Sequence, residues 1–267
     1  MLTSFFDQGM HRLNDIVRPG MLCAFDFDGT LAPIVTQPDK ASLPAPVLRR
    51  LTILSEYAPI AIITGRSIAD ICTRLAFVPD YVIGNHGIEG LPGETIDAEH
   101  YKALCNEWEA RLNMALQTHS SIDSGIWIEN KTYSLSVHYR LATNRTLAEK
   151  HLLALFARVT PEADIGTGKC VFNLLPPGAP NKGIALQRLC ESCQVPTAIY
   201  VGDDITDEDV FNMHRKDWLS LRIERSDDTA AEFYLNHRLD IVRLLDELIA
   251  RLATMPKWKN VTGAMSG

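Results

Sequence analysis

The sequence predicts an α/β protein with a Rossmann-like three-layer core, a parallel central sheet and an inserted α+β module. Short runs that are apolar throughout alternate with helical patterns at both ends of the chain, as in parallel sheets covered by helices on both faces. Polar residues directly follow these runs, at the edge where such sheets bind ligands. Between the two ends lies a segment whose strands alternate apolar and polar residues, which is typical of antiparallel strands with one solvent-exposed face.

The core elements are predicted from apolar runs and helical spacing. The run over 21–25 is too short for a stable helix, so it predicts a buried strand. Ser67 can cap the helix that it precedes. The first half of the core is predicted as a helix over 1–18, strands over 21–25, 60–64 and 81–84, and helices over 48–55 and 67–75. The second half is predicted as a helix over 181–189, strands over 197–201 and 219–223, and a helix over 239–252.

The inserted module has a different pattern. Alternation on both sides of Asn130-Lys131 predicts a β-hairpin with one polar face. The module is predicted as a helix over 99–118, the hairpin over 126–140, a helix over 143–159 and a strand over 170–175. We therefore expect residues 98–176 to form a separate domain between two parts of the core, 1–97 and 177–267.

The composition is that of an ordinary globular protein. Of the 267 residues, 46% are apolar and 22% are charged, with a formal net charge of −7. No basic block stands out and no apolar run reaches about 18 residues, so neither nucleic acid nor a membrane is an expected partner. The N-terminal residues lack the pattern of a signal peptide, and we expect a cytoplasmic protein.

The six cysteines mostly lie inside apolar patterns, as reduced core cysteines do. Cys190 and Cys193 form a Cys-x-x-Cys pair. A zinc or redox role needs a second pair or flanking histidines, and the sequence has none nearby. Helical spacing explains the pair, so we expect a structural role.

Two aspartates follow the first core strand. Asp26 and Asp28 are separated by one residue, and Gly29 comes next. Because side chains alternate along a strand, both carboxylates start on the same face. They repel each other there unless a cation lies beside them or one of them holds a proton. The pattern predicts an anionic nucleophile, a second acid and a cation site, and its alternative is an Asp-Gly turn without chemistry.

Polar residues at three more strand ends or helix starts complete this set. Thr64 ends the second core strand, Lys182 opens a helix, and Asp203 follows the strand over 197–201. A phosphate monoester repels an anionic nucleophile, and a divalent cation between the two removes that barrier. Because Mg²⁺ prefers oxygen ligands, Mg²⁺ is the expected cofactor.

The residue types indicate a role for each member of the set. Asp26 attacks phosphorus and forms an aspartyl-phosphate. Asp28 gives a proton to the leaving oxygen and later takes one from water. The carboxylates of Asp26 and Asp203 and the main-chain carbonyl of Asp28 hold the cation. Lys182 supplies positive charge for the phosphoryl oxygens and for Asp26, and Thr64 supplies a neutral hydrogen-bond donor.

Each of these features alone has a structural explanation. Thr64 can belong to a strand-to-helix turn and Lys182 to the solvated first turn of a helix, although a cation there opposes the helix dipole. The acidic residues over 203–208 can simply favour a helix N-terminus. Their occurrence together, each at a strand end or a helix start, favours the functional interpretation.

The four sites resemble the motifs of the haloacid dehalogenase superfamily of phosphotransferases. The most specific parts are Asp26-Phe27-Asp28-Gly29-Thr30 and Gly202-Asp203-Asp204-Ile205-Thr206-Asp207-Glu208. The second part is similar to trehalose-6-phosphate phosphatases, as are Thr64-Gly65-Arg66, Gly84-Asn85-His86-Gly87, His138-Tyr139-Arg140 and Gly168-Lys169. The resemblance covers core and insert, over about 21–223.

This resemblance implies a phosphatase that converts trehalose 6-phosphate to trehalose and phosphate, the last step of trehalose biosynthesis. It implies Asp26 as the nucleophile and Asp28 as the acid/base, with Thr64 and Lys182 on the phosphate. Mg²⁺ would be held by Asp26, Asp28 and Asp203, with Asp204 and Asp207 outside direct contact. The insert would be a cap that closes over the core and grips the disaccharide.

The resemblance also implies residues for recognition of the substrate. They are Gly65, Arg66, His86, Glu129, Lys131, His138, Arg140, Lys169 and Asn173. Glu129 and Lys131 share one face of the predicted hairpin, and a solvated strand face is the alternative explanation. Where the family pattern Gly-Lys-x-x-x-Glu ends in Glu, this chain has Asn173, which keeps an acceptor oxygen but loses the charge. We expect a weaker or shifted grip on one sugar hydroxyl.

Other functions are weighed against this one. The same chemistry could act on sucrose 6-phosphate or mannosyl-3-phosphoglycerate, and the sequence of the insert favours trehalose. A non-catalytic sugar-phosphate sensor need not retain Asp26, Asp28, Lys182 and Asp203 together. A mutase would have to shield the phosphoenzyme from water. A trehalose-phosphate synthase partner is left open, since no synthase-like domain lies in this chain.

Overall fold

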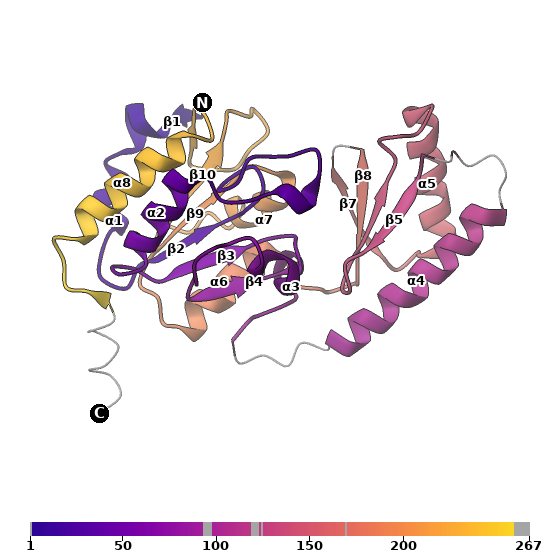
Figure 1. Cartoon of the computed structure of the whole chain (residues 1–267), viewed down its shortest axis with the longest axis horizontal. Helices are drawn as coiled ribbons and strands as arrows, with labels where there is room; N and C mark the ends of the chain where they lie inside the picture. The colour runs from indigo at the N-terminus through magenta and orange to yellow at the C-terminus, as the bar shows by residue number, and fades with distance from the viewer. Residues whose placement is uncertain (1, 93–97, 119–122, 124, 169, 259–267) are drawn as a thin grey trace. The chain divides into compact units, whose positions relative to one another are not determined.

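The computed structural model describes residues 2–92, 98–118, 123, 125–168 and 170–258. The chain forms two compact units, which are called here the core unit (Met1–Gly93 with Pro180–Gly267) and the inserted unit (Glu94–Ala179). Each unit is built around its own sheet, with seven strands in the first and four in the second (Figure 1). Among the described residues, no helix is both long and apolar enough to cross a bilayer.

The core unit contains a parallel sheet. Its strands are β1 (Thr3–Ser4), β2 (Leu22–Phe25), β3 (Ile60–Ile63), β4 (Tyr81–Ile83), β9 (Ala198–Gly202), β10 (Trp218–Ile223) and β11 (Phe233–Leu235). They lie in the order β1-β11-β10-β9-β2-β3-β4, and every pair is parallel. The central strands β2, β3 and β9 are buried at every residue. The predicted parallel central sheet is therefore confirmed.

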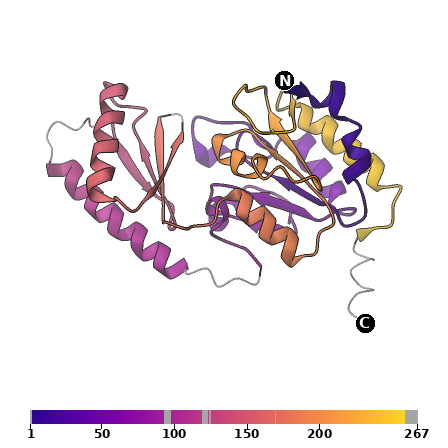
Figure 2. The same cartoon turned by 180° about the vertical axis from the view of Figure 1, so that it is seen from behind.

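Helices cover both faces of this sheet. They are η1 (Phe5–Gly9), α1 (Arg12–Ile16), η2 (Pro38–Lys40), α2 (Ala45–Leu54), α3 (Ile68–Cys72), η3 (Asn85–Gly87), α6 (Lys182–Ser192), η4 (Ile205–Asp207), α7 (Glu208–Phe211) and α8 (Asp240–Leu252). Helices α2 and α8 pack together on one face, and α6 lies on the other (Figures 1 and 2). The apolar faces of α2 and α8 join the strands in one buried cluster, which gives the expected three layers.

The N-terminal segment differs from its prediction. The single helix expected over 1–18 is instead a short strand, the π-helix η1 and α1. Strand β1 pairs with β11, and the fully buried Phe5 packs edge-on against Phe233, with ring centroids 6.1 Å apart. Tertiary pairing at the sheet edge therefore overrides the helical spacing. Strand β11, with only three residues, was not predicted.

The inserted unit is an antiparallel sheet with two helices. Its elements are α4 (Ala98–Thr118), β5 (Trp127–Asn130), β6 (Leu135–His138), α5 (Arg145–Val159), β7 (Asp164–Gly168) and β8 (Val171–Leu175). The strand order is β5-β6-β8-β7, with antiparallel neighbours. One face packs on the helices through buried residues such as Trp108, Phe156 and Phe172. The predicted hairpin turns at 131–134, where Lys131 N donates to Ser134 O. The glycine-containing β7 was not predicted.

Candidate functional site

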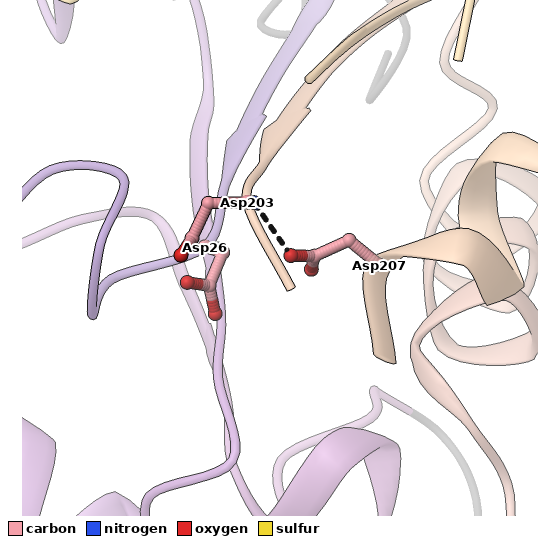
Figure 3. A group of neighbouring side chains, drawn as sticks. All are labelled: Asp26, Asp203 and Asp207. Atoms are coloured by element: carbon pink, nitrogen blue, oxygen red, sulfur yellow. Dashed lines mark hydrogen bonds between the residues drawn. The ribbon is translucent and has the colours of Figure 1, made fainter. Parts of the chain in front are cut away.

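The carboxyl ends of β2 and β9 bring two aspartates together. The strands are neighbours in the sheet, and Asp26 N donates to Val201 O at 2.9 Å. Asp26 directly follows β2 and Asp203 directly follows β9. Each of Asp26, Asp203 and Asp207 has a carboxylate oxygen within 4.8 Å of the others. Figure 3 shows these three side chains next to one another. Residues that are far apart in the sequence thus form one acidic group.

Lys182 is the cation inside this group. It lies in the first turn of α6 and is 2% exposed. Its Nζ donates to Asp26 Oδ1 at 2.8 Å and to Asp207 Oδ1 at 2.7 Å. Burial alone would lower the pKa of Lys182, but the charges of Asp207 and Asp26 raise it above its ordinary value. Lys182 is therefore charged, and two carboxylates compensate its unfavourable position at a helix N-terminus.

Asp207 has no free acceptor position for a cation. Its Oδ1 accepts from Lys182 and, at 2.6 Å, from the Tyr200 hydroxyl. Its Oδ2 accepts from the main-chain N–H groups of Asp203 and Asp204, both at 2.8 Å. Burial alone would raise the pKa of Asp207, but Lys182 and Tyr200 lower it. Because four donors occupy this ionised carboxylate, it positions Lys182 and the main chain that carries Asp203.

Asp26 and Asp203 have the features of cation ligands. Burial, with the nearby charges of Asp207 and Asp203, raises the pKa of Asp26 despite Lys182. Burial and the charge of Asp207 raise the pKa of Asp203 to about 7. Both carboxylates would ionise readily if a divalent cation lay between them. Their hard oxygen atoms suit Mg²⁺.

Gly29 and Thr30 shape the position of Asp203. A Cβ atom on Gly29 would lie 2.1 Å from Asp203 Oδ2, and the φ angle of Gly29 is +86°. Only glycine therefore fits where the chain turns away from the aspartates. Thr30 Oγ1 donates to Asp203 Oδ1 at 3.0 Å. The turn after β2 thus holds the carboxylate of Asp203, the residue that follows β9.

The side chain of Asp28 binds a different partner from the side chain of Asp26. Arg66 binds both of its carboxylate oxygens, with Nε–Oδ2 at 2.5 Å and Nη2–Oδ1 at 2.7 Å. Arg66 also donates to Asp70 and to the Pro38 carbonyl. Burial alone would lower the pKa of Arg66, but Asp28 and Asp70 raise it. The structure thus places Arg66, expected on the substrate, against the side chain of Asp28.

Two loops at the ends of β3 and β4 hold Thr64 and His86. Thr64 is buried, and its Oγ1 accepts from Arg66 N at 3.2 Å. His86 N donates to Thr64 O at 2.9 Å, and a Cβ atom on Gly65 would lie 2.5 Å from the His86 ring. Asn85 and His86 have φ angles of +47° and +57°. Such backbone conformations persist where the surrounding structure enforces them, often at functional sites.

Asp204 lies at the N-terminus of η4. Its side chain and that of Asp207 form a capping box there. Asp204 is exposed, in contrast to the fully buried Asp207. Asp204 therefore fixes the loop that follows β9 and takes no part in the buried acidic group.

The expected sugar-binding residues of the inserted unit lie at one face of its sheet or next to it. His138 Nε2 lies 2.9 Å from Glu129 Oε2, and Ser136 Oγ donates to Asn173 Oδ1 at 2.7 Å. Glu129 pairs in register with Ser136, and Ser136 pairs with Asn173. Lys131 begins the hairpin turn, and the exposed Arg140 follows β6. Lys169 lies outside the described residues.

Tyr200 was not among the predicted site residues. Its hydroxyl is buried against Asp207 Oδ1. Burial and the negative charge of Asp207 raise its pKa, so it remains a hydrogen-bond donor. The Tyr200 hydroxyl within the otherwise apolar run over 198–201 was the available signal. Tyr200 shares its strand face with Gly202, where the absence of a side chain leaves room for Asp207.

The sequence matches the model of a family described as trehalose-phosphatase over residues 24–236. A trehalose-phosphate phosphatase of Mycobacterium marinum is 29% identical over 261 residues, which cover 93% of this chain and 66% of that protein. The trehalose-phosphate phosphatase of Mycobacterium tuberculosis is 31% identical over 242 residues, covering 87% of this chain and 62% of that protein. The chain thus spans slightly less than two thirds of these curated relatives.

Solved structures share the fold. The C-terminal domain of Candida albicans trehalose-6-phosphate phosphatase superposes with a TM-score of 0.74 at 22% identity, covering 94% of this chain and 99% of that one. A trehalose-6-phosphate phosphatase related protein gives a TM-score of 0.70 at 23% identity, covering 86% and 97%. At such identities the likeness concerns the arrangement of the elements.

Proposed function

This chain belongs to the trehalose-phosphatase family of the haloacid dehalogenase superfamily, and we propose that it hydrolyses trehalose 6-phosphate to trehalose and inorganic phosphate. One observation carries the proposal. The buried Lys182 binds Asp26 and Asp207 at 2.8 and 2.7 Å, and the Asp203 carboxylate completes the group. Phosphoryl transfer needs a nucleophile, a fixed positive side chain and a site for a metal cation. This edge of the sheet offers Asp26, Lys182 and the Asp26–Asp203 pair for these three roles.

Mg²⁺ is the proposed cofactor. The carboxylates of Asp26 and Asp203 and the main-chain carbonyl of Asp28 would hold it, since Asp207 is occupied by four donors. The bound ion would neutralise the phosphate so that an anionic nucleophile can approach it. The raised pKa values of Asp26 and Asp203 support this, because a carboxylate pair left without a cation would tend to hold protons.

Asp26 is the proposed nucleophile. Lys182 holds its Oδ1, which leaves Oδ2 to attack phosphorus. The new Asp26–phosphorus bond forms as the bond between phosphorus and the sugar oxygen breaks, and the product on the enzyme is an aspartyl-phosphate. Lys182 and Thr64 bind the phosphoryl oxygens in this proposal, the first by charge and the second by a neutral hydrogen bond.

Asp28 is the proposed acid and base. Its proton goes to the departing sugar oxygen, and its carboxylate then takes a proton from water as that water attacks phosphorus. This second attack breaks the Asp26–phosphorus bond and releases phosphate. Arg66 donates to both carboxylate oxygens of Asp28 and so fixes the orientation of this carboxylate.

Sugar recognition is assigned to the inserted unit, with the proposed cap domain spanning 98–176. The Glu129 carboxylate and the Asn173 amide are groups that form hydrogen bonds with hydroxyls, and the wrong sugar would leave them without partners.

The proposed location is the cytoplasm. All six cysteines are free thiols, which fits a reducing compartment.

A phosphate-release screen tests the proposed function. The substrates are trehalose 6-phosphate, sucrose 6-phosphate, glucose 6-phosphate and mannosyl-3-phosphoglycerate, each with Mg²⁺ and with EDTA. We expect kcat/KM to be highest for trehalose 6-phosphate and activity to disappear in EDTA. A higher kcat/KM for another sugar phosphate would reassign the substrate. Absence of turnover on all four would favour a sensor.

A further inference from the structure

Trp127 exposes a large aromatic ring on the sheet of the inserted unit. It is the first residue of the edge strand β5 and is 49% exposed. Its ring stacks on that of His138, with centroids 3.9 Å apart and planes inclined by 12°. The two residues pair in register across β5 and β6. One face of the indole is therefore covered by His138, which leaves the exposed part of Trp127 for another contact.

The stacked pair is held in place by Glu129. His138 Nε2 lies 2.9 Å from Glu129 Oε2, and Glu129 is two residues after Trp127 on the same strand face. The contact limits rotation of the imidazole, and the imidazole in turn limits movement of the indole. Trp127 is thus preorganised, which reduces the entropy cost of binding a ligand against it.

The sheet face that carries Trp127 also presents polar side chains and glycine residues without side chains. Asn173 lies on it, two strands away from Glu129. On the neighbouring strand β7, Gly166 pairs with Asn173 and Gly168 pairs with Val171, so these positions add no side chain. The opposite face packs against helices through residues such as Phe172 and Leu174. The open face therefore combines one exposed aromatic ring with a carboxylate and an amide.

We infer that Trp127 is the stacking platform for a pyranose ring of the sugar phosphate, and this inference rests on the proposed function. A pyranose has an apolar face of C–H groups that can lie flat on an indole, and its hydroxyls need polar partners at the ring edge. An aromatic ring with a few placed polar groups is the usual composition of a small-ligand site. Trp127 contributes the apolar contact that Glu129 and Asn173 lack.

Steady-state kinetics with Mg²⁺ tests the platform. Trp127→Ala should raise KM for trehalose 6-phosphate about fivefold to tenfold, or roughly 1 to 1.4 kcal/mol at tenfold per 1.4 kcal/mol. Its kcat should change less than about twofold, since stacking acts equally before and during the reaction. Trp127→Phe should keep most of the affinity. With p-nitrophenyl phosphate, which has no pyranose, Trp127→Ala should match the wild type.

Leu141→Ala is the matched control, because Leu141 is a 75% exposed apolar residue of the same unit and lies outside the sheet strands. It should leave KM unchanged. An unchanged KM in folded Trp127→Ala would overturn the inference, and so would a fall in kcat alone. If the wild type prefers a different sugar phosphate, the proposed substrate is wrong, and the same variants test the platform on that sugar phosphate.

A binding measurement checks the platform without turnover. Trehalose is titrated into Asp26→Asn, and indole fluorescence is followed. Of the other three tryptophans, Trp108 and Trp218 are buried, at 0% and 5% exposure, and Trp258 is half-buried in the core unit, so Trp127 should dominate any change caused by sugar on the sheet of the inserted unit. Adding Trp127→Phe should remove the signal, and adding Leu141→Ala should keep it. A signal that survives Trp127→Phe would place the sugar elsewhere.

Discussion

Arg66 binds both carboxylate oxygens of Asp28, and it does so while bonding to Asp70 as well. The Arg66 side chain is only 13% exposed, and its guanidinium lies 5.7 Å from the Phe27 ring centroid. The residue expected from resemblance to contact the substrate is thus bound to the proposed acid/base. A bidentate ion pair fixes the orientation of a carboxylate, which makes Arg66 a positioning residue.

Replacing Arg66 by Ala should lower kcat about 10- to 100-fold, at most the lower end of the roughly 10²- to 10⁴-fold contribution of acid–base catalysis, and leave KM within twofold. The reason is that Asp28 would lose both its orientation and its charged partner. Arg74→Ala is the matched control, because Arg74 also binds Asp70 without touching Asp28. A rise in KM with unchanged kcat would instead make Arg66 a substrate ligand.

Asp26→Asn should lower kcat by about 10⁴-fold or more, as loss of a nucleophile does. The amide is a poor nucleophile, but it can still accept from Lys182 at the same position. Its thermal unfolding midpoint should stay near that of the wild type. Asp209→Asn serves as the control, since Asp209 is a nearby acid outside the carboxylate group. Steady hydrolysis by Asp26→Asn at the rate of the control would show that Asp26 is not the nucleophile.

Asp203→Asn should raise the unfolding midpoint in EDTA by about 2–4 °C, the usual effect of about 1 kcal/mol in a domain of roughly 150–250 residues. The substitution removes one half-buried charge that lies close to Asp26 and Asp207. Added Mg²⁺ should stabilise the wild type by mass action and the variant much less. The comparison is made by differential scanning calorimetry. Equal responses of both proteins to Mg²⁺ would exclude Asp203 as a ligand.

Asn173→Glu should change KM for trehalose 6-phosphate more than kcat. Asn173 Oδ1 already accepts from Ser136 Oγ at 2.7 Å, so we expect its NH₂ group to bind the sugar hydroxyl. Glutamate would present an acceptor where this chain presents a donor. Asn173→Gln, which keeps the amide and adds only length, is the control in the same kinetic assay. Equal effects of Asn173→Glu on KM and kcat would contradict a role in sugar binding.

Asp70→Asn should destabilise the protein near pH 7 by up to about 1 kcal/mol, a value limited by solvent screening. Burial alone would raise the pKa of Asp70, but Arg74 and Arg66 lower it. Because the folded pKa lies below the unfolded value of 3.8, the stabilisation is present above that pH and is lost as pH falls through the folded pKa.

Urea unfolding at pH 7 and near pH 3 measures this effect. The difference between wild type and Asp70→Asn should shrink at the lower pH. Asp39→Asn is the control, since the Asp39 side chain is 96% exposed and lies 3.5 Å from Arg74. A stability gap for Asp70→Asn that is the same at both pH values would mean that ionisation of Asp70 is not its source.

The sequence prediction missed two strands and misassigned the N-terminal segment, each for a physical reason. Strand β7 contains Gly166 and Gly168, which weaken any strand pattern, and it forms because β8 provides hydrogen-bond partners. Strand β11 is too short to show periodicity. The segment over 1–18 has apolar residues near helical spacing, but Thr3–Ser4 joins the sheet edge. Pairing with distant strands is not encoded in local spacing.

The sequence by itself determined the parallel sheet and which aspartates stand at its carboxyl edge, because a buried strand needs a continuous apolar run and its end is visible where polar residues begin. Only the tertiary structure decided which groups bind each other. Lys182 binds Asp207 as well as the expected Asp26, Arg66 binds Asp28, and Tyr200 binds Asp207. Such pairings depend on the direction and burial of side chains from separate elements, which hydrophobic periodicity does not specify.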